Sequence, residues 1–255
     1  MCFELDSLPP IAAIEGGAVE HRGLVLESSD GTRFAAFAAL PEEPSGKGVV
    51  VLPDVRGLYR FYEELVLRFA ERGIAAVAID YFGRTAGVGK RGEDFEYMAH
   101  VAQTTPESIQ ADVGAAVAWL HDFGAGSVFT VGFCFGGRNS WLSAAGGHGL
   151  AGAVGFYGVP AQREHPGPIQ RAGEMNAPIL ALQAGDDQNI TTADNAEFER
   201  ALTAAGVEHE ILTYPGAPHS FFDRRHEEFA DDSADAWSRV LAFIERYSIG
   251  GFDET

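Results

Sequence analysis

Apolar and polar positions along the chain follow two alternating periodicities. Eight short runs rich in apolar and β-branched residues are separated by segments whose apolar residues recur at three- and four-residue spacing. Several of the runs are apolar throughout, which is typical of parallel strands covered by helices on both faces. The predicted strands lie at residues 23–28, 34–40, 48–54, 74–80, 127–133, 150–158, 177–185 and 207–216.

The segments between these runs predict helices. Gly73 ends one of them, and Pro106 and Gly124 lie just inside the start and just past the end of another, as helix-terminal residues often do. The predicted helices occupy residues 60–73, 105–124, 191–206 and 226–247. This alternation predicts the α/β class, with a mostly parallel central sheet of about 7–8 strands flanked by helices on both faces.

The chain shows no internal repeat, low-complexity segment or linker. We therefore expect a single domain over residues 1–255, in which roughly the first 20 residues form an extension. The longest irregular stretch, residues 84–103, is interpreted as an insertion near one end of the sheet.

Charge limits the classes of partner that the sequence allows. The formal net charge is −19, which disfavours nucleic acid and anionic membrane surfaces because both bind basic patches. We expect neither as a partner. An anionic substrate would need arginines placed locally in its site.

The lack of a recognisable targeting pattern and the low number of cysteines indicate a reducing compartment. No apolar stretch reaches about 18 residues, and the opening residues "MCFELDSLPP" have neither a basic region nor an apolar region typical of a secretory signal. Cys2 and Cys134 are too few for a disulfide framework. A cytoplasmic location is the expectation.

Cys134 has the most informative surroundings. It lies in "TVGFCFGG" (130–137), where a predicted strand turns into a helix start through small residues at 132, 136 and 137. This is G-x-C-x-G, the cysteine version of the nucleophile elbow, which exposes the side chain at the carboxyl edge of a sheet. The following helix N-terminus can stabilise a thiolate or an oxyanion. The alternative is an inert buried cysteine.

Two later loops supply the partners that a cysteine nucleophile needs. Asp186 and Asp187 follow the strand at 177–185, and His219 follows the strand at 207–216. The order nucleophile, acid, histidine is that of a catalytic triad on an α/β sheet. The residues alone do not distinguish Asp186 from Asp187 as the acid, whereas the other seven histidines are interpreted as surface or structural.

The combination of motifs resembles the dienelactone hydrolase family of α/β-hydrolases from about residue 20 to the C-terminus. The resemblance depends on "VVVLPDVRGLYRFYEEL", "AAVAIDYFGRT", "VGFCFGG", "LQAGDDQNIT" and "YPGAPHSFF". It implies the α/β-hydrolase fold, with Cys134 as nucleophile, His219 as base and Asp187 as acid. Asp187 is favoured because the family's acid lies three residues before an apolar residue, here Ile190.

The resemblance also implies roles for residues around the triad. Asp54 occupies the place of an acidic residue that contacts the resting thiol, although the family's type member has the longer glutamate there. The backbone amides of Val55 and Phe135 would form the oxyanion hole. Arg84 matches an arginine that binds a substrate carboxylate, with an ordinary loop arginine as the alternative.

Other positions near the expected pocket bear on the substrate. Arg56 and Tyr59 are close to it in sequence and are candidate substrate-binding residues. The family's second substrate-binding arginine, four residues past the histidine, is replaced by Asp223. The particular lactone is therefore left open.

We expect a cysteine-dependent hydrolase that cleaves a small ester or lactone, with or without a carboxylate group, through a thioester intermediate. The alternatives are a general carboxylesterase or thioesterase on the same triad, and a non-catalytic member of the fold that binds a ligand or senses oxidation. No dinucleotide fingerprint, phosphate loop or metal-ligand spacing is present. We expect no cofactor, no metal, and a monomer or small homo-oligomer.

Overall fold

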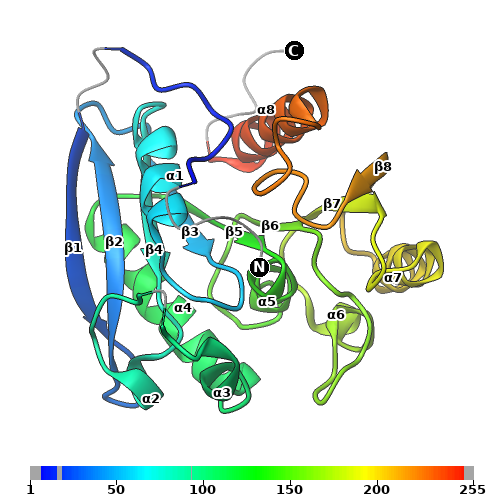
Figure 1. Ribbon diagram of the computed structural model, residues 1–255, viewed down its shortest axis with the longest axis horizontal. Coiled ribbons are helices and arrows are strands. Elements are labelled where there is room, and N and C mark those ends of the chain that lie inside the picture. The colour runs from blue at the N-terminus through cyan, green and yellow to red at the C-terminus, as the bar shows by residue number, and fades with distance from the viewer. Residues whose placement is uncertain (1–6, 16–18, 93, 250–255) are drawn as a thin grey trace.

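The computed structural model describes residues 7–15, 19–92 and 94–249. Its centre is an eight-stranded sheet in the order β1-β2-β4-β3-β5-β6-β7-β8 (Figure 1). The strands are β1 (Val19–Glu27), β2 (Arg33–Pro41), β3 (Lys47–Leu52), β4 (Ile74–Ile79), β5 (Ser127–Phe133), β6 (Gly152–Phe156), β7 (Ile179–Asp186) and β8 (His209–Pro218). Each predicted strand is present, and the predicted fold class is confirmed.

The sheet is parallel except at one end. β1 pairs antiparallel with β2, and β2 pairs antiparallel with β4, whereas the strands from β4 to β8 run parallel. The carboxyl ends of six strands therefore meet at one edge, which is where α/β sheets carry their ligand sites.

Helices cover both faces of the sheet. They are α1 (Arg60–Ala70), α2 (Gly83–Ala86), α3 (Tyr97–Val101), α4 (Pro106–Asp122), α5 (Phe135–Ser143), α6 (Pro168–Arg171), α7 (Thr192–Ala205) and α8 (Ala230–Tyr247), with a short 3₁₀ turn at Ala172–Glu174. α1 and α8 pack on one face, while α4, α5 and α7 pack on the other. Successive strand residues alternate between the two cores: Val49 and Val51 join the first and Val50 the second.

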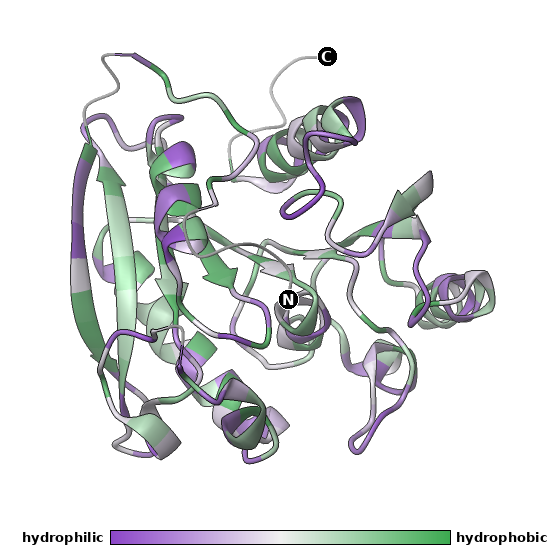
Figure 2. Ribbon diagram, viewed as in Figure 1, coloured by the Kyte–Doolittle hydropathy of each residue, from purple (hydrophilic) through white to green (hydrophobic). Residues whose placement is uncertain are grey.

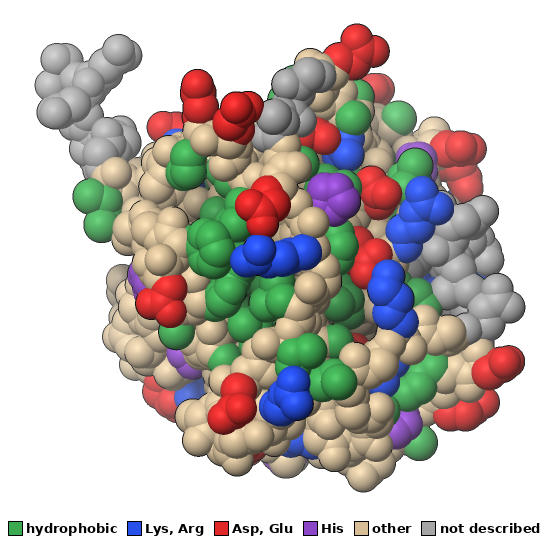
Figure 3. All heavy atoms as spheres, turned by 90° about the vertical axis from the view of Figure 1, so that its left-hand side faces the viewer, with side chains coloured by type: hydrophobic (Ala, Val, Ile, Leu, Met, Phe, Trp, Pro, Cys, Tyr) green, Lys and Arg blue, Asp and Glu red, His purple; other side chains and the backbone are tan. Residues whose placement is uncertain are grey.

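β1 is an edge strand with a mixed surface. The inner strands are largely green in the hydropathy view, whereas β1 also carries hydrophilic residues (Figure 2). Charged side chains surround the apolar side chains on this side of the molecule (Figure 3), where Val25 is exposed. Glu20 and Arg22 form an ion pair on this strand. Charges on an edge strand disfavour pairing with another chain.

Two segments differ from the sequence prediction. The stretch 84–103 contains α2 and α3 rather than being wholly irregular. The helix predicted from residue 226 begins at Ala230, because residues 219–229 form turns that carry His219. The prediction of one domain with an N-terminal extension stays a prediction, and part of that extension, residues 1–6 and 16–18, lies outside the described residues. Within the described chain, no helix has both the length and the apolar composition needed to span a bilayer.

Candidate active site

Cys134 occupies a strained turn between β5 and α5. Its backbone has φ 56° and ψ −112°, a conformation that non-glycine residues rarely adopt. The Cys134 N–H donates to Phe156 O at 3.0 Å, so the turn is tied to the neighbouring strand β6. Strain of this kind persists only where the surroundings enforce it, and it clusters at functional sites.

The glycines around Cys134 are required by close backbone contacts. A Cβ at Gly132 would lie 2.0 Å from Gly136 O, and a Cβ at Gly136 would lie 2.0 Å from Leu52 O. Helix α5 therefore starts directly against β3 and β5, at a distance that only glycine permits. This packing explains why the motif places glycines on both sides of the cysteine.

Cys134 lines a cavity of about 620 Å³ at the carboxyl edge of the sheet. Most of its wall is apolar and comes from α3, the start of α4, α5 and the loop after β6. The lining residues are Val55, Met98, Val101, Ala102, Thr104, Thr105, Pro106, Ile109, Cys134, Phe135, Arg138, Asn139, Leu142, Val159, Arg163, Glu164, His165 and Pro166. This volume suits a small organic ligand.

Two backbone amides beside Cys134 have no acceptor among the residues that the structure describes. Val55 lies in the loop after β3, and Phe135 is the first residue of α5, so its N–H has no partner within the helix. In the described part of the chain, neither N–H donates a backbone hydrogen bond to another residue. Both residues line the cavity with Cys134, so both amides are available to a ligand oxygen.

His219 is hydrogen-bonded to Asp187. The distance from His219 Nδ1 to Asp187 Oδ2 is 2.6 Å, and the Asp187 side chain is fully buried while that of His219 is one-quarter exposed. The neighbouring Asp186 is exposed. Of the two aspartates that the sequence left open, Asp187 is the one that orients the imidazole.

Tyr157 links the histidine to the strands around Cys134. Its ring centroid is 4.8 Å from that of His219 and 6.3 Å from that of Phe133, the residue before Cys134. The loop after β8 therefore folds back over the end of β6. The thiol makes no side-chain hydrogen bond with any described residue, including His219. Hydrogen bonds between catalytic groups are often long in the absence of substrate.

Asp54 is fully buried in the loop after β3. Its Oδ1 accepts the Arg56 N–H at 2.9 Å, and its backbone N–H donates to Tyr62 Oη at 2.9 Å. Its Oδ2 lies 3.5 Å from Arg56 Nε but accepts no hydrogen bond from any described residue. In this conformation Asp54 therefore makes no hydrogen bond to the thiol, and one of its carboxylate oxygens remains able to accept one.

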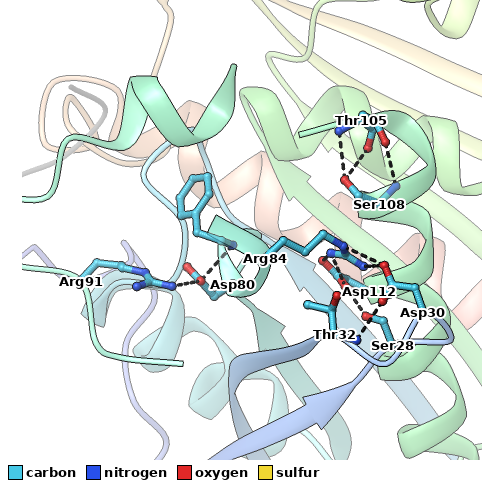
Figure 4. A network of polar contacts seen from close by, with 10 residues as sticks. Ser28, Asp30, Thr32, Asp80, Arg84, Arg91, Thr105, Ser108 and Asp112 are labelled. Carbon is cyan, nitrogen blue, oxygen red and sulfur yellow. Dashed lines mark hydrogen bonds and ion pairs between the residues drawn. The ribbon is translucent and has the colours of Figure 1, made fainter. Parts of the chain in front are cut away.

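Arg84 does not lie at this cavity. Its guanidinium donates two hydrogen bonds to Asp112, at 2.9 and 2.8 Å, and another to Asp30 at 3.0 Å (Figure 4). Asp112 is buried and also accepts from Ser28. In this conformation two carboxylates already neutralise the guanidinium, and the substrate contact of Arg84 stays a prediction.

Arg56 and Tyr59 are also absent from the lining of the Cys134 cavity. The buried Arg56 side chain lies against Asp54 and over the Tyr59 ring, 5.1 Å from its centroid. Tyr59 Oη donates to Gly92 O at 3.1 Å, and Tyr59 lines a separate cavity beside β1 and β2. Sequence proximity to Asp54 suggested a shared pocket, whereas the structure places Tyr59 at the separate cavity; the substrate-binding role of both residues stays a prediction.

Arg138 and Arg163 are the arginines that the structure places at the cavity, and the sequence reasoning missed both. Arg138 donates to the carbonyl oxygens of Val159, Ala161, His165 and Pro166. Among the described residues it has no carboxylate within ion-pair distance. Burial lowers the pKa of Arg138 to about 10, with a contribution from the positive charge of Arg163, so it stays protonated at neutral pH.

A positional signal could have found these two residues. Arg138 is four residues after Cys134 on the same helix, hence one turn away on the same face. Arg163 lies in the loop after β6, at the same carboxyl edge. Among the residues described, no group of three or more His, Cys, Asp or Glu side chains could hold a metal ion.

The parallel sheet, the strained cysteine turn at its carboxyl edge and the histidine–aspartate pair in the last two loops define an α/β-hydrolase. The chain belongs to the dienelactone hydrolase family, whose model matches residues 34–248, and it is a hydrolase of that family.

Individual relatives agree with this assignment. The chain is 29% identical to an Escherichia coli K12 protein named "Putative carboxymethylenebutenolidase", over 88% of this chain and 87% of that protein. It is 32% identical to a Synechocystis protein of the same name, over 87% and 95% of the two chains. A crystal structure from Klebsiella pneumoniae titled "Putative Dienelactone Hydrolase" superposes with a TM-score of 0.80 at 26% identity, covering 90% of this chain and 100% of that one.

Proposed function

We propose that the protein is a cysteine-dependent hydrolase that cleaves a small ester or lactone, with Cys134 as nucleophile, His219 as base and Asp187 as the residue that orients His219. The observation that carries the proposal is the strained turn that presents Cys134 to a cavity beside two unpaired amides. An idle buried cysteine would not need this backbone conformation.

The first half of the reaction forms a thioester. His219 Nε2 takes the proton of the Cys134 thiol, while Asp187 stabilises the imidazolium through Nδ1. The thiolate attacks the carbonyl carbon, and the amides of Val55 and Phe135 donate to the resulting oxyanion. The tetrahedral intermediate collapses, the C–O bond breaks, and His219 returns its proton to the leaving oxygen.

The second half regenerates the enzyme. His219 accepts a proton from water, the hydroxide attacks the thioester carbonyl, and the same two amides hold the second oxyanion. The C–S bond breaks and the thiolate recovers its proton from the imidazolium. With a lactone, the carboxylic acid and the alcohol that are formed belong to one product molecule.

The cavity favours a substrate with an anionic group beside the ester. Arg138 and Arg163 bring positive charge to a wall that is otherwise mostly apolar, and Arg138 is desolvated. An electrostatic interaction is stronger at such a site than in water. We infer that a carboxylate on the substrate lies towards Arg138, and not towards Arg84, whose carboxylate partners are already in place.

The test compares wild-type protein with Cys134→Ala on chromogenic esters and on a dienelactone. We expect Cys134→Ala to lower kcat/KM at least 1,000-fold, on the order of loss seen when a catalytic nucleophile is removed, with an unchanged melting temperature. Iodoacetamide should inactivate the wild type in parallel. Unchanged hydrolysis by Cys134→Ala would refute the mechanism.

The substrate panel separates the alternatives. Turnover of neutral esters or thioesters at the same rate as anionic ones would favour a general carboxylesterase or thioesterase on the same triad. Alkylation of Cys134 without turnover of any substrate would favour a ligand-binding or thiol-sensing protein.

A further inference from the structure

Asp223 is a buried carboxyl group that the mechanism above does not use. It lies four residues after His219 in the turns between β8 and α8, and only 1% of it is exposed. Its Oδ2 accepts the Tyr157 hydroxyl at 2.7 Å, and its Oδ1 accepts the Arg224 N–H. Within the described residues, no basic side chain lies within ion-pair distance of it. A buried carboxylate without a counter-ion is rare in proteins.

Charged and titratable groups face Asp223 from three sides. Tyr157 contacts it from the end of β6, Asp54 lies on the side of the loop after β3, and His219 precedes it in its own loop. Asp54 is in turn paired with Arg56. Burial raises the pKa of Asp223 to about 7; Asp54 acts in the same direction, while the two hydrogen bonds and His219 oppose the rise.

Tyr157 connects Asp223 to the imidazole. It is fully buried and has φ 37°, a value uncommon for a bulky residue. Its N–H donates to Leu182 O at 2.9 Å and its hydroxyl donates to Asp223, so both ends of the residue are fixed. Its ring lies 4.8 Å from the His219 ring at an interplanar angle of 54°. The carboxyl therefore fixes the wall against which the imidazole packs.

We propose that Asp223 is a positioning residue of the site: its carboxyl holds Tyr157 against His219, and its charge controls how readily the His219 imidazole takes up a proton. The ionised carboxylate attracts a positively charged imidazolium, so His219 is a stronger base when Asp223 is charged. Only the consequence for turnover rests on the proposed function, since the effect on the imidazole needs no substrate.

The experiment follows the NMR titration of the histidine ring protons in the full chain, with His219→Gln identifying the His219 signal. Asp223→Asn keeps the shape and removes the charge. We expect its His219 titration midpoint to fall by at least about half a pH unit, and the second inflection near neutral pH to disappear. The exposed Asp231→Asn, which removes an equal charge from the start of α8, should leave the midpoint within about 0.1 unit.

Tyr157→Phe separates the hydrogen bond from the charge. It keeps the ring beside His219 but removes a donor that stabilises the Asp223 carboxylate, so the inflection caused by Asp223 should move to higher pH. Thermal melting shows whether Asp223→Asn folds. If it does not fold, the Tyr157→Phe titration tests by itself whether Asp223 affects His219. A merely structural role would change the melting temperature without moving either inflection.

The outcomes are distinct from those of the hydrolase test. Superimposable His219 titrations in wild type, Asp223→Asn and Tyr157→Phe would overturn the inference, even in an active enzyme. A shifted titration in a protein that hydrolyses no ester would support the inference while the proposed function failed. In an active enzyme, the pH profile of kcat/KM should shift with the His219 midpoint.

Discussion

Arg84 and Arg138 are two partly buried arginines near the same edge of the sheet, and they differ in what neutralises them. Arg84 has the carboxylates of Asp112 and Asp30 as partners. Within the described ranges, Arg138 donates only to backbone carbonyl oxygens, and Arg163 adds a second positive charge nearby. Carbonyl dipoles orient a guanidinium without cancelling its charge, whereas carboxylates do both.

This difference distinguishes the Arg84 cluster, whose charges are paired within the protein, from the candidate site around Cys134. The Arg84 group joins α2 to α4 and to the turn between β1 and β2, and its charges neutralise one another within the protein (Figure 4). Around Cys134, the guanidinium of Arg138 has no carboxylate partner and the two amides have no acceptor among the described residues, so we propose that they interact with a ligand. Changes at the first cluster should therefore alter stability, and changes at the second should alter rates.

The largest effect is expected at Asp187. Asp187→Asn should lower kcat by about 1,000- to 10,000-fold, because it favours the wrong tautomer of the imidazole and removes the charge that stabilises the imidazolium. Steady-state ester hydrolysis is the measurement. The exposed neighbour provides the matched control: Asp186→Asn should stay within about threefold of wild type. Equal losses in both variants would contradict the assignment of the acid.

Arg84→Met should lower stability by about 3 kcal/mol, because it leaves the buried Asp112 carboxylate without its counter-ion. Urea unfolding at pH 7 measures the loss. The kcat/KM of the folded fraction should change less than twofold. A selective loss of activity towards anionic esters would instead place Arg84 in the substrate site.

The pH dependence of stability tests whether Asp223 carries an uncompensated charge. Its pKa of about 7 in the folded protein exceeds the value of about 3.9 expected when unfolded, so its contribution to stability is full below about pH 4 and is lost as pH rises to about 7. Asp223→Asn removes this loss. The difference in unfolding free energy between Asp223→Asn and wild type should therefore rise by about 3 kcal/mol from pH 5 to pH 8.

Urea unfolding of both proteins at the two pH values measures this gain. Parallel behaviour of wild type and Asp223→Asn would mean that Asp223 does not change charge in this range. Asp231→Asn again serves as the exposed control, with no pH-dependent gain.

The smallest effect is expected at Arg138. Arg138→Met should lower kcat/KM about tenfold for an ester bearing a carboxylate and less than threefold for its neutral analogue, since it removes the charge that the structure leaves without a carboxylate partner. Arg138→Lys should recover part of the preference. Equal losses for both substrates would mean that Arg138 acts only by holding the loop at 159–166.

Residues whose role depends on local chemistry were predictable. The elbow at Cys134 follows from the spacing of its glycines, because Gly132 and Gly136 lie where any Cβ would collide with backbone. The eight strands follow from apolar runs whose alternate residues face two cores, as Val49 and Val50 do. The loops carrying Asp187 and His219 follow from the ends of those strands.

Residues whose role depends on a distant partner were not predictable. The pairing of Arg84 with Asp112, 28 residues later, gives no sign in the sequence. Arg56 and Tyr59 were candidates for substrate binding because they are close to Asp54 along the chain, whereas the structure places Arg56 against Asp54 and Tyr59 beside β1 and β2. The start of α8 was placed four residues early because the pattern did not reveal the turns after His219.

By itself the sequence determined the class of fold, the cysteine turn and the order of the three candidate triad residues, since periodicity and backbone sterics act over a few residues. The tertiary structure decided which aspartate holds His219, which arginines line the Cys134 cavity, and that Asp223 and Tyr157 meet beside the imidazole. Charge compensation and burial are properties of neighbours in space, and these neighbours lie tens of residues apart along the chain.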